Sequence, residues 1–271
     1  MLDHRPHRAA FLNRRGIIVE PAGQPLAVPV GAEPAVVANA ELIILTVKAG
    51  ALKRALAALL PFLSADTLLL GLQNGISQLQ VFSELKPHCA WACGVSTEGA
   101  TLLGPGHVRA GGAGLTLLGF VEPPDRVAAQ RLAATTGLFN RGGCPSRISQ
   151  DIRRQLWRKL IINAGINALT VIHDCPNGGL LEIAAARQTM AAAVQEAAAV
   201  AAAAGITFTE DLVASTEEVC RQTATNISST LQDYRRGQES ELAAINGEIV
   251  RQAASFGLPA PVNHQLLAAT A

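Results

Sequence analysis

Residues 155–177 read QLWRKLIINAGINALTVIHDCPN, and this stretch decides the fold of the second half of the chain. Its apolar residues recur with helical periodicity and no proline interrupts it before Pro176, so the sequence predicts a helix. Lys159, Asn163 and Asn167 are spaced four residues apart, which turns each about 40° around the axis from the one before. Buried without partners, such groups would cost roughly 1–3 kcal/mol each, so we expect them to border a polar, ligand-holding cleft.

The overall composition limits the class of protein. The chain has 271 residues, of which 49% are hydrophobic, and this is enough for two domains. A net charge of +1 without a basic cluster argues against nucleic acid as a partner. No apolar run approaches the roughly 18–20 residues that cross a membrane, and the N-terminal residues do not resemble a signal peptide. We therefore expect a cytoplasmic protein without a membrane segment.

Five cysteines are scattered along the chain. An odd, scattered set indicates reduced thiols rather than a disulfide framework. His88, Cys89 and Cys93 could suggest a metal site, but residues 89–95 look like a strand and no second pair of ligands follows. We expect no bound metal.

The first half of the chain alternates short apolar strands with helices. Such alternation implies a largely parallel sheet, wound in the dinucleotide-binding manner of a Rossmann-like domain. From residue 149 onward the sequence is helical throughout, so we predict an α/β domain over 1–148 and an all-α substrate domain over 149–271. The expected strands are 17–19, 26–30, 41–47, 67–71, 90–95 and 143–148, an antiparallel run covers 99–119, and the expected helices are 6–15, 49–60, 76–85 and 125–138.

The beginning of the chain departs from a complete dinucleotide-binding domain. Such a domain starts with a strand and a Gly-x-Gly-x-x-Gly turn, whose backbone amides hold the pyrophosphate. No such turn precedes the first strands here, and the chain resembles a domain entered at its second strand, near Leu2–Asp3. The missing strand and helix would amount to about 25–30 residues and would leave two unpaired strand edges. A wrong start, a fragment and a degenerate copy all fit the sequence.

Several longer motifs resemble the ketopantoate reductase (2-dehydropantoate 2-reductase) family. The helical half carries the most specific of them, and their order and spacing suit the family. The motifs are TVKAG at 46–50, QNG at 73–75, STEGATLLGPGHV at 96–108, LWRKLIINAGINALTVIHDCPNG at 156–178, NISSTLQD at 226–233 and ESELAAING at 239–247.

The resemblance implies NADPH-dependent reduction of the ketone of 2-dehydropantoate to pantoate, on the way to pantothenate and coenzyme A. It makes Lys159 the general acid that protonates the forming alkoxide. Physical chemistry agrees, because hydride addition places negative charge on oxygen and a cation with a transferable proton stabilises it. The alternative is a lysine that extends to solvent. Glu241 matches the family's glutamate, which contacts the substrate hydroxyl and helps to place the lysine, although a first-turn helix carboxylate is the alternative.

The resemblance also implies a set of substrate-binding residues, namely Asn163, Asn167, Asn177, Asn226 and Ser229. Asn177 lies in a Pro-Asn-Gly turn, so a purely turn-forming role is its alternative. The segment around Ser229 meets the substrate carboxylate in the family. Since serine is a preferred N-cap residue, Ser228 or Ser229 could instead begin the next helix. Asp233 shares the Ser229 face, and we interpret it as structural.

On the cofactor side, Lys48 and Asn74 follow two strands of the expected parallel sheet. The carboxyl ends of such strands bind ligands, and in the family the two residues lie near the cofactor and its nicotinamide. Arg5 follows the expected second strand, where an arginine would pair with the 2′-phosphate of NADPH. Arg8 is its rival. Asp3 stands where an NAD enzyme would carry its ribose acid.

Three functions stay open on the sequence alone. The first is an NADPH-dependent reductase of 2-dehydropantoate, and the second is a reductase of the same architecture that acts on another 2-oxo acid. The third is a non-catalytic or impaired relative that lacks the pyrophosphate loop, whose helical half only packs or forms a homodimer. A small-molecule 2-oxo acid is the expected partner in the first two cases.

Overall fold

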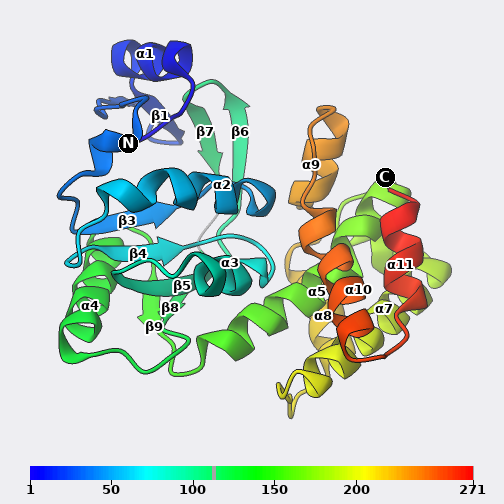
Figure 1. Cartoon of the computed structure of the whole chain (residues 1–271). Coiled ribbons are helices and arrows are strands. Elements are labelled where there is room, and N and C mark those ends of the chain that lie inside the picture. The colour runs from blue at the N-terminus through cyan, green and yellow to red at the C-terminus, as the bar shows by residue number, and fades with distance from the viewer. Residues whose placement is uncertain (112–113, 271) are drawn as a thin grey trace. The chain divides into compact units, whose positions relative to one another are not determined.

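The chain forms two compact units in the computed structural model, which describes residues 1–111 and 114–270 (Figure 1). The first unit holds the sheets, and the second is helical. The first comprises Met1–Val47, Ala51–Leu72 and Val81–Ile152, and the second comprises Lys48–Gly50, Gln73–Gln80 and Arg153–Ala271. Two short segments that directly follow strands thus group with the helical unit, which a single division at residue 148 does not anticipate.

A five-stranded sheet forms the centre of the first unit. Its order is β3-β4-β5-β8-β9, and neighbouring strands run parallel except β5 and β8, which are antiparallel. The strands are β3 (Leu42–Leu45), β4 (Leu68–Gly71), β5 (Ala90–Ser96), β8 (Thr116–Gly119) and β9 (Ser146–Ile148). The predicted α/β fold with a Rossmann-like sheet and a helical domain is confirmed.

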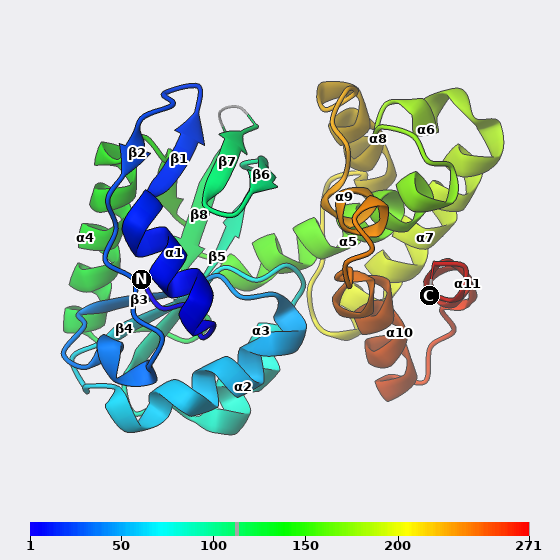
Figure 2. The ribbon, with the colours of Figure 1, turned by 90° about the horizontal axis from the view of Figure 1, so that it is seen from above.

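Helices cover both faces of this sheet (Figure 2). They are α2 (Ala49–Leu59), continued by the 3-10 turn η2 (Leu60–Phe62), α3 (Ser77–Leu85) and α4 (Arg126–Arg141), while η1 (Pro34–Val37) precedes β3. Successive strand residues point to opposite faces. Accordingly, Leu69 shares a buried cluster with Phe82 of α3, whereas Leu68 and Leu70 share another with Leu132 of α4. Burial on both faces explains why β4 is apolar at every position.

A second, four-stranded sheet accompanies helix α1 (Pro6–Arg15) in the same unit. Its order is β2-β1-β7-β6, formed by β1 (Ile17–Glu20), β2 (Pro25–Leu26), β6 (Ala100–Gly104) and β7 (His107–Ala110). β6 and β7 pair antiparallel, as the glycine-rich run predicted, and Gly106 takes a positive φ of 69° in the turn between them.

The predicted strand at residues 26–30 is wrong beyond Leu26. Pro29 has no backbone N–H to donate, which limits its use in a sheet. A side chain replaces the strand partner further on, because Val30 N donates to Asn13 Oδ1 at 2.9 Å and Asn13 Nδ2 donates to the Val30 carbonyl at 2.7 Å. The backbone at Val30 is therefore satisfied without a ladder.

The first residues of the chain belong to neither sheet. Leu2 forms an isolated parallel bridge with Gly31, and Asp3 N donates to the Gly31 carbonyl at 3.0 Å. Among the described residues, β3 is the last strand at its end of the five-stranded sheet. The expected strand end at Leu2–Asp3 thus corresponds to a short extended segment.

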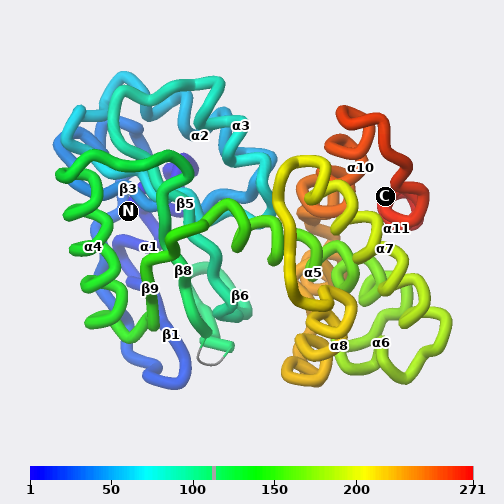
Figure 3. Tube along the Cα trace, turned by 90° about the horizontal axis from the view of Figure 1, so that it is seen from below, coloured from blue at the N-terminus to red at the C-terminus, as the bar shows by residue number. Residues whose placement is uncertain are grey.

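The second unit is built around α5 (Ile152–Ile172) and α7 (Ala184–Ala203). The remaining elements are α6 (Gly179–Glu182), α8 (Leu212–Gln222), α9 (Ser229–Arg235), η3 (Leu242–Ala244), α10 (Asn246–Ser255) and α11 (Pro261–Ala268). The alanine-rich α7 contacts α6, α8, α10 and α11, since small side chains let helix axes approach closely (Figure 3). Within the described part of the chain, no helix is both long and apolar enough to cross a bilayer.

The predicted long helix ends earlier than residue 177. α5 stops at Ile172, Asp174 adopts a left-handed φ of 43°, and Cys175 N donates to the Thr170 carbonyl at 3.2 Å. Aspartate tolerates this conformation, and Pro176 then prevents a further helical turn. Asn177 therefore does not belong to the helix that carries the other two carboxamides.

Buried polar side chains fasten the helices of this unit to one another. Asn246 Nδ2 donates to the Ala164 carbonyl and to Asn263 Oδ1, both at 3.0 Å. Asn263 Nδ2 donates in turn to the Ala193 carbonyl at 3.0 Å and to Glu196 Oε2 at 2.9 Å. Asn246 and Asn263 are fully buried, so these bonds join α5, α7, α10 and α11 inside the core.

Candidate active site

The polar stripe of α5 has the geometry that its spacing predicts. Lys159, Asn163 and Asn167 all lie within the continuous helix, so the three side chains leave on one side of its axis. Lys159 and Asn163 are half-buried and Asn167 is 6% exposed, while Leu160 and Ile161 beside them are fully buried. The stripe is thus a polar seam in an otherwise apolar helix.

Both carboxylate oxygens of Glu241 are held in place. Oε2 accepts a hydrogen bond from Asn74 Nδ2 at 2.7 Å, and Oε1 accepts one from Ala49 N at 3.1 Å. Ala49 is the first residue of α2, so the carboxylate occupies the positive end of that helix and satisfies one of its free amides. Glu241 itself precedes the short helix η3. The structure therefore brings together Glu241 and Asn74, two predicted site residues.

A glycine allows Asn74 to come this close. Gly75 has a positive φ of 83°, and a Cβ atom at that position would collide with the carbonyl oxygen of Ala244, in the η3 helix that follows Glu241. Only glycine combines this conformation with this approach. The Asn-Gly pair thus places the carboxamide next to the carboxylate.

Lys159 is an unusual lysine because its ammonium group is removed from water. Burial lowers the pKa of Lys159 from 10.5 to about 8, and the negative charge of Glu241 opposes this shift. At neutral pH the side chain is still largely protonated, yet its proton is held much less tightly than that of a lysine in water. A lysine of this kind is suited to giving up a proton during a reaction.

Lys48 lies in the same unit but contacts protein groups. Its Nζ donates to Asp233 Oδ2 at 2.9 Å and to the carbonyl oxygen of Glu239 at 2.5 Å. An ammonium group has three N–H bonds, so one donor is left beyond these two contacts. No spacing along the sequence predicts a contact between Lys48 and Asp233, the residue that we interpret as structural from the sequence alone.

Asn177 and Asn226 are neighbours through their backbones. Asn177 N donates to the Asn226 carbonyl at 3.0 Å, and Asn177 Nδ2 donates to Thr223 Oγ1 at 2.8 Å. Since Thr223 Oγ1 already donates its hydrogen to the Val219 carbonyl, it can only accept from Asn177. The buried Asn177 Oδ1 has no hydrogen-bond partner among the described residues, so it remains an acceptor for a hydroxyl or amide donor.

Ser228 and Ser229 have different positions at the start of α9, which the sequence alone leaves open. Ser228 is the N-cap: its Oγ accepts from Leu231 N at 3.0 Å and lies 2.6 Å from Thr170 Oγ1. Ser229 is the first helical residue and is exposed, as is Asn226. Capping therefore falls to Ser228, and the hydroxyl of Ser229 is accessible to a ligand.

Arg5 belongs to the other unit, where it shares an acid with Arg8. Arg5 Nε lies 3.4 Å from Asp3 Oδ1, and Arg8 Nε lies 3.0 Å from Asp3 Oδ2. Two guanidinium groups thus neutralise one carboxylate and leave a surplus of positive charge at the surface.

No cluster of three or more metal-ligating side chains occurs among the residues described.

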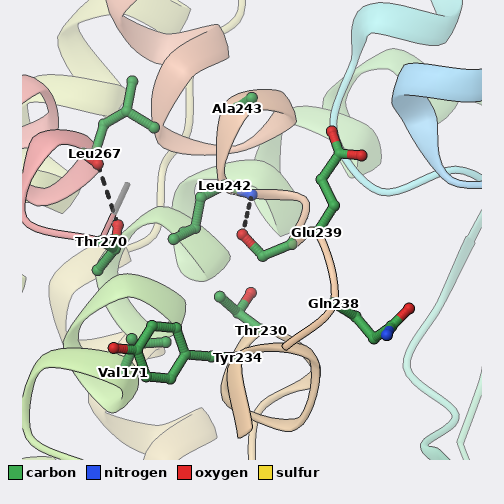
Figure 4. A pocket seen from close by; sticks show the side chains of 10 residues that line it. Val171, Thr230, Tyr234, Gln238, Glu239, Leu242, Ala243, Leu267 and Thr270 are labelled. Carbon is green, nitrogen blue, oxygen red and sulfur yellow. Dashed lines mark hydrogen bonds between the residues drawn. The ribbon is translucent and has the colours of Figure 1, made fainter. Parts of the chain in front are cut away.

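A pocket in the helical unit lies next to Glu241, and its lining does not include the predicted catalytic residues. It has a volume of about 420 Å³, and Figure 4 shows Leu242, Thr230 and Tyr234 around it. Glu239 and Ser240 contribute to its wall, but Lys159, Glu241 and the α5 carboxamides do not. This pocket therefore does not include the residues that the sequence predicts for catalysis.

Comparisons with known proteins agree over nearly the whole chain. The family model described as Ketopantoate reductase PanE/ApbA matches residues 1–123, and the model of the C-terminal part of that family matches residues 151–271. A 2-dehydropantoate 2-reductase from Halobacterium salinarum is 31% identical over 97% of this chain and 86% of its own length. One from Vibrio cholerae is 33% identical over 84% of this chain and 76% of its own.

Solved structures share this fold over nearly the whole chain. A PanE/ApbA family ketopantoate reductase from Ralstonia eutropha JMP134 superposes with a TM-score of 0.88 at 29% identity, covering 98% of this chain and 87% of that one. D-mandelate dehydrogenase in complex with NADH and anilino(oxo)acetate superposes with a TM-score of 0.89 at 25% identity, covering 99% and 88% of the two chains.

Proposed function

This chain belongs to the ketopantoate reductase family of oxidoreductases, and from that premise we propose that it reduces 2-dehydropantoate to pantoate with NADPH, a step toward pantothenate. One observation carries the proposal. Lys159 has a pKa lowered to about 8 by burial, and the charge of Glu241, whose carboxylate is hydrogen-bonded by Asn74, acts on it. A proton donor beside a fixed carboxylate is what carbonyl reduction requires of a protein.

The protein's part in the reaction is to deliver a proton. Bound NADPH supplies the hydride that adds to the carbonyl carbon. Lys159 Nζ then gives one proton to the carbonyl oxygen, which becomes the hydroxyl of the product, and the ammonium becomes a neutral amine. Because burial lowers the pKa of Lys159, its ammonium group gives up this proton more readily than the ammonium group of a solvated lysine does. Glu241 keeps the ammonium protonated until the oxygen develops charge.

Neutral donors and acceptors would bind the rest of the substrate. The exposed Ser229 hydroxyl and Asn226 carboxamide offer donors to the substrate carboxylate without a buried ion pair. Asn163 and Asn167 extend from the same side of α5 as Lys159. The acceptor Asn177 Oδ1, which has no hydrogen-bond partner in the described part of the chain, suits the hydroxyl group at the far end of 2-dehydropantoate.

The residues proposed for the cofactor fit an anionic dinucleotide in their charge. Arg5 and Arg8 provide more positive charge than Asp3 neutralises, which suits the 2′-phosphate of NADPH. Lys48 has a donor beyond its contacts to Asp233 and Glu239, and it can meet a further anionic group. These side chains are therefore the cofactor contacts that we assign.

The proposal is tested by following NADPH consumption at 340 nm with the purified chain and a set of 2-oxo acids. We expect turnover with 2-dehydropantoate, and weaker turnover with 3,3-dimethyl-2-oxobutanoate, which differs only in lacking the terminal hydroxyl group. An Asn177→Ala variant should narrow the difference between these two substrates. Equal rates with both substrates in the unchanged protein would contradict the proposed substrate.

A reductase of another 2-oxo acid is the second candidate. The likeness to D-mandelate dehydrogenase, which was solved with anilino(oxo)acetate, favours an aromatic 2-oxo acid as the alternative substrate. Phenylglyoxylate therefore belongs in the same panel. A higher kcat/KM for phenylglyoxylate than for 2-dehydropantoate would select this candidate.

A non-catalytic relative is the third candidate, and cofactor binding separates it from a reductase. Such a protein would keep the helical unit but bind NADPH poorly. The chain contains two tryptophans, Trp91 and Trp157, so cofactor binding can be followed by quenching of their fluorescence. Saturable quenching by NADPH supports the reductase, whereas its absence up to millimolar cofactor supports the non-catalytic relative.

A further inference from the structure

A single ammonium group links three parts of the helical unit near the proposed proton donor. Lys48 Nζ donates to Asp233 Oδ2 at 2.9 Å and to the Glu239 carbonyl at 2.5 Å. Asp233 lies on α9, and Glu239 lies in the connection from α9 to η3, two residues before Glu241. We call these three residues the Lys48 bridge.

The connection that the bridge holds begins in an exposed turn and ends at Glu241, which Asn74 and Ala49 N hold. Residues 237–239 are exposed and Gly237 has a positive φ of 61°, so the chain leaves α9 in a turn. The Asp233 carbonyl accepts hydrogen bonds from Arg236 N at 3.0 Å and Gln238 N at 2.9 Å. Beyond that turn, the Lys48 contact with the Glu239 carbonyl is the next fixed point before Glu241 reaches Ala49 N.

Lys48 and Ala49 are consecutive, so adjacent residues hold the connection at two points. The side chain of Lys48 holds Glu239, and the backbone N–H of Ala49 holds the Glu241 carboxylate at 3.1 Å. We propose that Asp233 is a positioning residue, which orients Lys48 so that the connection from α9 places Glu241 beside Lys159. The proposal rests on the proposed function of Lys159 and Glu241, and it gives Asp233 a role in place of a purely structural one.

An ion pair of this exposure contributes little to stability by itself. The Lys48 side chain is 48% exposed and that of Asp233 is 21% exposed. Its importance would come from position, because a shift of about 1 Å in a group near the reacting atoms can cost up to about 100-fold in rate. The bridge should therefore affect the reaction more than the folding of the chain.

The same helix supplies a matched control. Arg235 of α9 pairs with Asp174, with Nη2 2.7 Å and Nε 2.9 Å from Oδ1. This exposed pair also ties α9 to a neighbouring segment, at the end of α5, but it contacts nothing in residues 238–241. Asp174→Asn removes one charge from one ion pair of α9, as Asp233→Asn does, without disturbing the Glu241 connection.

The first experiment does not depend on turnover. The chain has four lysines, Lys48, Lys53, Lys86 and Lys159, so NMR of the protein labelled with ¹³C and ¹⁵N at lysine resolves each side chain. We expect the pKa of Lys159 to fall in Glu241→Gln and also in Asp233→Asn, and to stay unchanged in Asp174→Asn. An unchanged Lys159 pKa in Asp233→Asn, together with a fall in Glu241→Gln, would overturn the proposal.

A further variant separates position from direct charge effects. Lys48→Met removes a positive charge, and this alone would raise the pKa of Lys159. Loss of the bridge would instead withdraw Glu241 and lower that pKa. A fall in Lys48→Met supports the positioning role, and a rise contradicts it.

The kinetic experiment applies where the chain reduces a 2-oxo acid. We expect Asp233→Asn to lower kcat by about tenfold or more with a change in KM below about threefold, and Asp174→Asn to change kcat by less than about twofold. The double variant of Lys48→Met and Asp233→Asn should be no slower than the slower single variant. A kcat for Asp233→Asn within about twofold of the unchanged protein would refute the role. An inactive unchanged protein would refute the proposed function, while the NMR titration would still decide the role of Asp233.

Discussion

Asn74 and Glu241 are 167 positions apart in the sequence, and Asn74 Nδ2 donates a 2.7 Å hydrogen bond to Glu241 Oε2. Asn74 follows a strand of the sheet, and Glu241 stands at the entrance to η3. The other carboxylate oxygen is taken by Ala49 N, so Glu241 cannot rotate freely. The carboxylate that acts on Lys159 is therefore fixed by a side chain and by a helix N-terminus.

Asn74→Ala should lower kcat by about 10- to 100-fold, because a hydrogen bond to a charged group is worth about 1.5–3 kcal/mol and its loss frees the carboxylate. Steady-state kinetics measure this effect. Gln238→Ala is the control, since Gln238 is exposed and its carboxamide makes only a 3.5 Å contact to the Arg236 carbonyl. An Asn74→Ala enzyme as fast as this control would show that Glu241 needs no such support.

Arg5→Ala should weaken NADPH binding and leave NADH binding nearly unchanged. Arg5 and Arg8 share Asp3, so removing Arg5 cancels the surplus of positive charge that suits a 2′-phosphate. Titration of tryptophan fluorescence with both cofactors gives the two Kd values. We expect the ratio to change by about tenfold. Arg15→Ala, at the last residue of helix α1 and ten residues after Arg5, should not change this ratio. An equal loss of affinity for both cofactors would argue against a 2′-phosphate contact.

Lys159→Met should stabilise the folded protein at pH 7. The folded-state pKa of Lys159, about 8, lies below its ordinary value of 10.5, so folding costs free energy while the side chain is charged. Between those values the unfolded chain binds more protons than the folded one, and the stability of the unchanged protein rises with pH. The gain in Tm of Lys159→Met should therefore shrink from pH 7 to pH 10. A gain in Tm that is the same at both pH values would rule out this linkage.

Asn263→Leu should destabilise the helical unit by about 3 kcal/mol or more, because it removes three side-chain hydrogen bonds of the buried Asn263, those to Asn246, the Ala193 carbonyl and Glu196. Urea unfolding followed by circular dichroism measures the free energy of unfolding. Gln222→Leu is the control, since the exposed Gln222 carboxamide contacts only Glu218, at 3.0 Å, and its loss should cost less than about 0.5 kcal/mol. Similar losses in the free energy of unfolding for the two variants would show that this hydrogen-bond network does not stabilise the core.

Local sequence patterns predicted much of the fold and part of the site. The four-residue spacing of Lys159, Asn163 and Asn167 placed them on one side of α5, since helical periodicity is a local property. Strands β3, β4 and β5 are also predictable from the sequence, because each is a short run rich in apolar residues between turns.

Tertiary contacts decided what the sequence left open. Ser228 rather than Ser229 is the cap, and its hydroxyl also makes a hydrogen bond to Thr170 Oγ1. α5 ends where Asp174 adopts a left-handed backbone conformation. The contact of Lys48 with Asp233 joins residues 185 positions apart, and no local pattern announces such a pair. Sequence spacing can therefore predict candidate residues of the site but not the residues with which they form hydrogen bonds or ion pairs.

The pH dependence of turnover tests the role of Lys159 most directly. We expect kcat to be constant at neutral pH and to fall above about pH 8, as the ammonium loses its proton, and Lys159→Ala to abolish turnover while its Kd for NADPH stays nearly unchanged. Turnover by Lys159→Ala at a rate near that of the unchanged protein, with the same fall above pH 8, would contradict the account.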